Sequence, residues 1–247
     1  MILTDLTNIN HVLSSSLDTQ DGVLIGTTLF LGFVALFVPY FSELIKRYYF
    51  APSIIIEFDE KSPDCHKTIC KTWDPQTGEI IYDEPFYQFR FRVKNEGKSQ
   101  AKKCEVVVQK LFLSNSAGNF KPYMPYTPVN LNWGSGNDKF VDINPQRTFF
   151  CDLLSIPSNS QQKRLVESGK YINPPETSPY EYGIILNVQN IFFSQPNRLP
   201  KGKYKVELNV FSENCKLIKA SFEISWSGNW KDDENNMFQE IVIEQIR

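Results

Sequence analysis

One uncharged, apolar run near the start of the chain constrains the fold more than any other feature of the sequence. From Gly22 to Ser42 no residue carries a charge. A helix over residues 22–42 spans roughly 30 Å at about 1.5 Å per residue, which matches the hydrocarbon core of a bilayer. The run therefore predicts a single transmembrane helix, preceded by a short tail of residues 1–21.

Two other interpretations of this run are less consistent with the sequence around it. A cleaved signal peptide begins with basic residues and ends at a site of small residues. Here Asp18 and Asp21 precede the run, which ends in the sequence VPYFSEL. A buried helix of a soluble domain rarely extends this far without a charged side chain. We therefore interpret the run as a membrane anchor that contacts lipid.

The charges that flank the run predict its direction across the membrane. Lys46 and Arg47 follow it, whereas no Lys or Arg precedes Lys46. Basic residues favour the cytoplasmic side, so the N-terminal tail is expected outside and the large C-terminal part in the cytoplasm. The expected location is the plasma (inner) membrane, crossed once.

Residues 43–52 are expected to extend the helix as a short juxtamembrane segment. Lys46, Arg47, Tyr48 and Tyr49 suit the interface, where aromatic rings and basic groups meet anionic headgroups. Pro52 is expected to end the helix. An apolar stripe with helical spacing crosses the segment, formed by Phe41, Leu44, Ile45, Tyr48 and Tyr49.

Small residues recur in the run at a spacing that lets two helices approach closely. They are Gly22 with Gly26, and Thr28 with Gly32. Such spacing is common in apolar helices, so we favour lipid-facing small residues over an oligomer seam.

Charge and cysteine content limit the partner classes and the compartment. The formal net charge is −2, which argues against nucleic acid as a partner. An odd number of irregularly spaced cysteines does not resemble a secreted disulfide framework. We expect reduced, mostly buried thiols in a cytoplasmic domain. The five are Cys65, Cys70, Cys104, Cys151 and Cys215.

From Ser53 onward the hydrophobic periodicity changes to that of strands. In FYQFRFRVKNEG one face holds only apolar side chains and the other only polar ones, which predicts a half-buried strand. The apolar set is Tyr87, Phe89, Phe91 and Val93, and the polar set is Gln88, Arg90, Arg92 and Lys94. Further strands are expected in SIIIEFDE, AKKCEVVVQKLFLS, KFVDINPQRTFFCDLLSI, YGIILNVQN, GKYKVELNVFSEN and KLIKASFEISWSG.

These strands predict a mainly β domain over residues 53–247. With no regular alternation of strands and helices, the expected architecture is an immunoglobulin-like antiparallel β-sandwich behind one N-terminal transmembrane helix. Short helices are expected at residues 160–168 and in KDDENNMFQE, whereas the tail IVIEQI is ambiguous.

The stretch VKNEGKSQAKKCEVVV resembles bacterial immunoglobulin-like domains of the CARDB type. The matching residues are Val93, Asn95, Gly97 and Ala101, and GKYKVELNV is similar to the penultimate strand of such sandwiches. The resemblance implies a sandwich fold. Domains of this type usually lie outside the cell, opposite to the topology predicted here, so the resemblance is used for the fold alone.

Motifs for chemistry are scarce in the domain. Cys65, His66 and Cys70 lie in DCHKTIC, but no second pair completes a tetrahedral zinc site, and the expected structure is an exposed loop between the first two strands. No glycine-rich phosphate loop, nucleophile elbow or kinase signature is present. We expect neither a cofactor nor enzymatic activity.

Two segments are candidate binding surfaces. Tyr123, Tyr126 and Trp133 lie in the proline-rich stretch FKPYMPYTPVNLNWGSG, where they form either an exposed platform or rings packed over the sandwich edge. Lys163 and Arg164 begin the long segment 162–182, where they face either anionic groups or solvent.

The leading hypothesis is a single-pass membrane protein whose cytoplasmic sandwich binds another protein. A carbohydrate-binding or adhesion module on the outer surface is the alternative, and it requires the opposite topology. An unrecognised hydrolase or zinc enzyme is the third, and the single histidine after the helix gives it little support.

Overall fold

The chain forms two compact units in its computed structural model, Met1–Ala51 and Pro52–Arg247. The structure describes residues 3–73, 76–78, 80–123, 126–134, 136, 138–167, 183–189 and 197–246.

The first unit is one continuous helix, α1 (Leu3–Tyr49). Its segment Val23–Ile45 is long and apolar enough to cross a membrane. The predicted extension of the helix to Tyr49 is confirmed, and the N-terminal tail is helical as well, from Leu3 onward. A Cβ atom added at Gly26 or Gly32 would meet nothing within 4 Å, so both positions have room for lipid or for a second helix.

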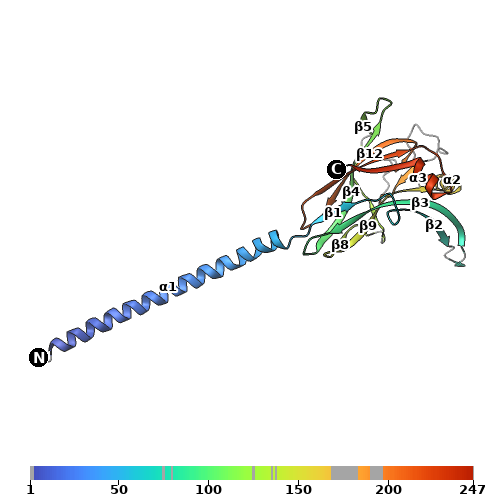
Figure 1. The fold of residues 1–247 in the computed structure, drawn as a ribbon. Coiled ribbons are helices and arrows are strands. Elements are labelled where there is room, and N and C mark those ends of the chain that lie inside the picture. Colours follow the sequence, from blue (N-terminus) through green and yellow to red (C-terminus); the bar gives the residue numbers. More distant parts are fainter. Residues whose placement is uncertain are drawn as a thin grey trace. The chain divides into compact units, whose positions relative to one another are not determined.

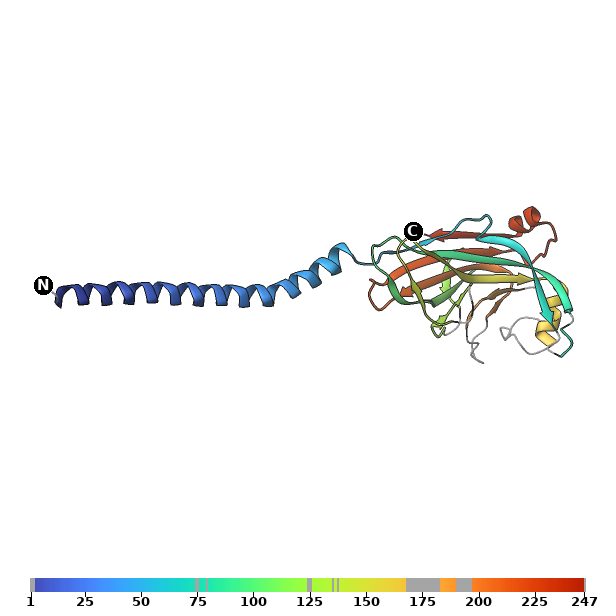
Figure 2. The same cartoon turned by 90° about the horizontal axis from the view of Figure 1, so that it is seen from below.

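The second unit is mainly β, with two antiparallel sheets in a sandwich (Figure 1; Figure 2). The β3 sheet has the order β1 (Ile54–Glu57), β3 (Ile80–Asn95), β9 (Thr148–Pro157), β10 (Ile184–Leu186) and β11 (Arg198–Leu199), with β2 (Cys65–Trp73) on β3 and β7 (Asn132–Trp133) on β9. The β12 sheet has the order β14 (Ile241–Ile246), β13 (Ile218–Trp226), β12 (Gly202–Phe211), β4 (Ala101–Ser114) and β5 (Phe120–Pro122), with β6 (Val129–Asn130) and β8 (Val141–Ile143) on β4. The short helices are α2 (Asn159–Glu167) and α3 (Glu234–Glu240).

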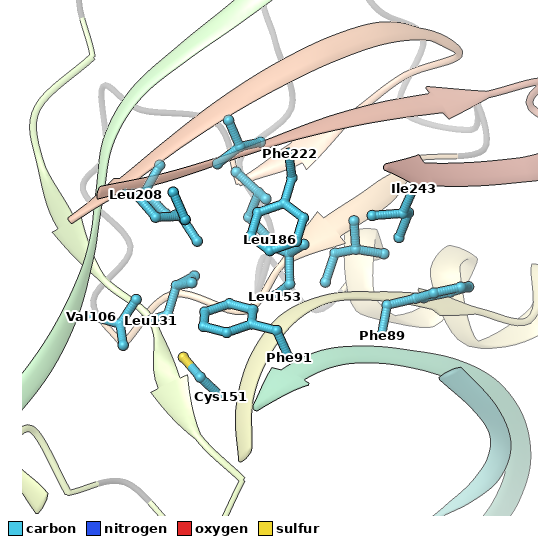
Figure 3. Packing of buried hydrophobic residues seen from close by; sticks show 14 of the residues in the cluster. Phe89, Phe91, Val106, Leu131, Cys151, Leu153, Leu186, Leu208, Phe222 and Ile243 are labelled. Carbon is cyan, nitrogen blue, oxygen red and sulfur yellow. The ribbon is translucent and has the colours of Figure 1, made fainter. Parts of the chain in front are cut away.

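The core lies between the sheets and is built from alternate residues of each strand. On β3 the predicted apolar face is buried as a whole, and Phe91 is fully enclosed. Its ring stacks on that of Phe222 from β13, with ring centroids 5.5 Å apart. Figure 3 shows these two rings pointing toward one another from opposite sheets, with Cys151 and Leu153 of β9 close by. The contact joins the two layers directly.

Most predicted elements are confirmed, including both short helices, and the ambiguous tail forms the edge strand β14. The exposed loop expected around DCHKTIC is wrong. Cys65–Trp73 is strand β2, paired along its length with β3 from Ile80 to Phe89. The sequence of β2 is polar and lacks a clear alternation. The strand forms because the N-terminal half of β3 pairs with it along its length.

The amide of Asn95 fixes the point at which the chain enters the sandwich. Its Oδ1 accepts hydrogen bonds from the backbone N–H of Ser53 at 3.1 Å and of Gly97 at 3.0 Å. Its Nδ2 donates to the carbonyl oxygens of Ser99 at 2.7 Å and Ile143 at 2.9 Å. Asn95 itself is fully buried, and these four bonds satisfy both the oxygen and the nitrogen of its amide.

Replacing this amide by an apolar side chain of similar size should destabilise the domain strongly. In Asn95→Leu four backbone groups lose their partner, and those of Gly97 and Ile143 do so in buried positions, so we expect a loss of roughly 3–5 kcal/mol in the free energy of unfolding. Urea unfolding of Pro52–Arg247 measures it. Asn235→Ala, at an exposed position on α3, is the control and should stay within about ±0.5 kcal/mol. Equal stability of the two variants would contradict the role assigned to Asn95.

Candidate functional site

The aromatic stretch predicted as a binding platform is largely packed into the sandwich. Trp133 lies on β7 and is 1% exposed, and its ring meets Phe149 edge-on at 6.4 Å between centroids. Tyr123 is half-buried and packs edge-on against Tyr204 at 5.8 Å, and Tyr126 also packs against the core. The expectation of an exposed platform is therefore corrected for Trp133, and the alternative of rings packed over the sandwich describes this stretch.

The predicted basic segment begins on helix α2. Lys163 is exposed, whereas the neighbouring Gln162 is buried and its side chain bonds both the N–H and the C=O of Gly183, at 3.1 and 3.0 Å. The same side chain accepts from Arg198 of β11 at 3.2 Å. The Arg164 side chain and residues 168–182 lie outside the described residues. Lys163 is thus on the solvent side of a helix whose other side is anchored to β10 and β11.

The predicted metal candidates do not converge within the described part of the chain. Cys65 points into the core and is 2% exposed, while the adjacent His66 faces outward. Burial, with a further contribution from the Asp64 carboxylate, raises the pKa of the Cys65 thiol to about 12, so it is protonated at neutral pH. The Cys70 side chain lies outside the described residues. No group of three His, Cys, Asp or Glu side chains that could hold a metal ion occurs among the described ones.

The described cysteines are free thiols. Cys65, Cys104 and Cys151 are buried and Cys215 is half-buried. Burial raises the pKa of the Cys104 thiol to about 11 and that of Cys151 further above its ordinary value. Of the predicted interface residues, Tyr49 is exposed, and the side chains of Lys46, Arg47 and Tyr48 lie outside the described part.

A more distinctive cluster lies on the outer side of the β3 sheet, where β2, β3 and β9 run side by side. His66 pairs with Gln88, and Arg90 pairs with Asp152, so four polar residues from three strands become neighbours. Phe150 completes the group. All five side chains are half-buried. This set, His66, Gln88, Arg90, Phe150 and Asp152, is called the Arg90 face.

The guanidinium of Arg90 is held in place by two contacts. Its carbon lies 4.2 Å from the centroid of the Phe150 ring, a cation–π arrangement. Its Nε donates to the carbonyl oxygen of Pro63 at 2.9 Å. Within the described residues no carboxylate lies at ion-pair distance from Arg90. The two terminal nitrogens of the guanidinium therefore keep donors available.

The neighbouring arginine on the same row of β3 is already neutralised. Arg92 donates from Nε to Asp64 Oδ2 at 3.1 Å, and its NH1 lies 3.7 Å from Glu57 Oε2. The Asp64 carboxylate is fully buried beneath it. Arg92 therefore joins β1 and the β1–β2 connection to β3 through ion pairs. Arg90 also contacts this connection, through the carbonyl oxygen of Pro63, but it makes no ion pair within the described residues.

The other polar groups of the Arg90 face have perturbed protonation equilibria. Burial raises the pKa of the Asp152 carboxyl, against the opposing effects of Arg90 and of the hydrogen bond that Gln88 Nε2 donates to Oδ1 at 2.9 Å. Burial, together with the Arg90 charge, lowers the pKa of His66. His66 is thus mostly neutral at neutral pH, and Arg90 is the fixed positive charge of the face.

The alternation on β3 predicted that Gln88 and Arg90 point outward. It did not identify Phe150 and Asp152 as their neighbours, because that depends on the register of β9 against β3, which contains a bulge between Phe89 and Arg90. The alternation in TFFCDLLSI places Phe150 and Asp152 on one side of their strand, and this was the signal available in the sequence.

Comparison with known proteins adds no further restriction on function. No protein-family model matches the chain, and no curated protein matches it at a significant level of similarity.

The raised pKa of Asp152 predicts a pH-dependent gain in stability when its charge is removed. The pKa of Asp152 in the folded state lies above the unfolded value of about 3.8. At pH values above both, the ionised carboxylate therefore lowers the free energy of unfolding. Asp152→Asn keeps an acceptor for Gln88 and should raise the urea midpoint at pH 7. The gain should disappear as the pH falls below about 3.8.

The matched control is Asp138→Asn, at an exposed position. It should leave the midpoint at pH 7 unchanged. A destabilised Asp152→Asn variant at pH 7 would mean that the carboxylate is held favourably, against the raised pKa.

Proposed function

We propose that this protein is a single-pass membrane protein whose β-sandwich recognises a protein partner in the cytoplasm through the Arg90 face. The observation that carries the proposal is the state of Arg90. Its guanidinium lies over the Phe150 ring and donates from Nε to the carbonyl oxygen of Pro63. Within the described residues, no carboxylate accepts a hydrogen bond from its two terminal nitrogens. The group that it would bind on a partner is a carboxylate, of a side chain or of a chain end, because the two oxygens of a carboxylate match two parallel donors of a guanidinium.

The physical case for a protein ligand rests on pre-organisation. Arg and aromatic residues dominate the binding energy of protein interfaces. A guanidinium already held against a ring loses less side-chain entropy on binding than a free one. The neighbouring Gln88, whose amide is bonded to Asp152, keeps the surroundings of Arg90 ordered as well.

The strand order supports an immunoglobulin-like assignment of the sandwich. β1, β3 and β9 follow the order of strands A, B and E in one sheet, and β4, β12 and β13 follow that of C, F and G in the other. The other strands, among them β2 and β14, lie outside these six. Sandwiches of this kind present faces and edges to other proteins, which is consistent with a binding module.

Membrane attachment is proposed from the apolar segment Val23–Ile45 of α1. A cytoplasmic position for the sandwich is proposed from the basic pair Lys46 and Arg47, which follows this segment while no basic residue precedes it.

Site-specific photo-crosslinking in native membranes tests the binding surface. A photoreactive residue in place of Thr68, which shares the outward side of β2 with His66, should form an adduct with one defined protein. Adding Arg90→Gln should reduce this adduct at least about tenfold if the guanidinium contributes more than about 1.4 kcal/mol to binding. Arg90→Lys should restore it only in part, because an ammonium lacks the fork of donors.

Two controls make the result specific. Lys139→Gln removes another exposed cation that lies above an aromatic ring, 4.8 Å from the centroid of Phe140, and should leave the adduct unchanged. A probe at the exposed Val242 of β14 should not give the same adduct. An adduct that survives Arg90→Gln in full would contradict recognition through the Arg90 face.

A further inference from the structure

Three loops lie together at the end of the sandwich where the chain enters it. They are residues 96–100 between β3 and β4, residues 144–147 between β8 and β9, and residues 212–217 between β12 and β13. This set is called the entry loops. The first two are joined by Asn95 and by the bond that Gln100 Nε2 donates to Asn144 Oδ1 at 3.0 Å.

The third entry loop is bonded to the first. The backbone N–H of Lys102 donates to Asn214 Oδ1 at 2.9 Å, and Asn214 Nδ2 donates to the carbonyl oxygen of Gln100 at 2.8 Å. The hydroxyl of Ser212 donates to the carbonyl oxygen of Lys102 at 2.8 Å. The entry loops are therefore one connected surface.

Chain connectivity keeps this surface near the membrane if α1 crosses it. The backbone N–H of Glu96 donates to the carbonyl oxygen of Ser53 at 2.8 Å, so the first entry loop is bonded to the residue before β1. Helix α1 ends at Tyr49 and β1 begins at Ile54. The chain between them reaches at most about 17 Å when fully extended.

The charge of the surface is positive although that of the whole chain is negative. Two of its lysines pair with its own acids, Lys94 with Glu96 at 2.8 Å and Lys103 with Glu213 at 2.5 Å. Lys102, Arg147 and Lys216 are exposed, and within the described residues they have no ion pair. Basic side chains therefore outnumber acidic ones on and beside the entry loops; the basic ones are Lys94, Lys98, Lys102, Lys103, Arg147 and Lys216, and the acidic ones Glu96, Asp142 and Glu213.

We propose that the entry loops bind the anionic headgroups of the membrane that α1 crosses, and so fix the sandwich against the bilayer surface. Lys102, Arg147 and Lys216 supply the unpaired charge. Leu217, 45% exposed beside Lys216, is an apolar side chain placed to enter the interface between headgroups and acyl chains. The inference rests on the membrane attachment proposed above, but not on the Arg90 face.

The test uses the full chain in lipid nanodiscs, with a photoreactive residue in place of Leu217 and mass spectrometry of lipid adducts. Discs of phosphatidylcholine alone are compared with discs in which a third of the lipid is phosphatidylglycerol. We expect at least about three times more lipid adduct in the anionic discs, and loss of that excess at about 1 M salt, where the screening length is about 3 Å. A probe at Val242, far along the β12 sheet from the entry loops, should give little adduct in either disc.

The variant Lys102→Gln, Arg147→Gln, Lys216→Gln should lose the excess adduct in anionic discs. A matched variant, Lys71→Gln, Lys121→Gln, Lys201→Gln, removes exposed lysines away from the entry loops and should keep it. Both variants are first compared with the parent by thermal melting.

The outcomes separate the two proposals. If the chain does not co-purify with the discs, the membrane attachment fails and this inference fails with it. If the chain stays in the discs but the Leu217 probe gives equal adduct in neutral and anionic lipid, headgroup binding by the entry loops is overturned while attachment stands.

Discussion

The buried amide of Asn95 is the interaction on which the arrangement of this domain depends. It lies at the end of β3, the strand that pairs with β1, β2 and β9, and it bonds four backbone groups that come from the entry segment, the β3–β4 turn and β8. Five residues earlier on the same strand, Arg90 presents its guanidinium on the outward side, and between them Phe91 joins the two sheets through Phe222. One strand therefore carries the entry of the chain, the core contact and the candidate binding surface.

The amino-acid sequence was sufficient to predict the parts of this fold that are set by local periodicity. The alternation in FYQFRFRV predicted both the buried and the outward rows of β3, and the uncharged run predicted a helix that continues to Tyr49. Strand β2 was missed because its stability comes from the ladder with β3 rather than from a pattern of its own. Trp133 was ambiguous because proline-rich flanks are typical of loops, whereas its burial depends on pairing with β9.

The candidate site was less predictable than the fold for the same reason. Arg90 and Arg92 are equivalent in sequence, both outward and two residues apart. Their difference arises from neighbours that are distant in the chain: Asp64 and Glu57 neutralise Arg92, whereas Phe150 holds Arg90 without neutralising it. Contacts of this kind depend on strand register, which a hydrophobic pattern does not specify.

The proposed function requires that the sandwich is attached to a membrane and faces the cytoplasm. The most direct measurement is a pair of reporter fusions after residue 247, one active only in the cytoplasm and one active only outside it. We expect activity of the cytoplasmic reporter alone, in a membrane fraction. Activity of the external reporter alone would contradict it, and would favour an outward-facing carbohydrate-binding or adhesion module instead.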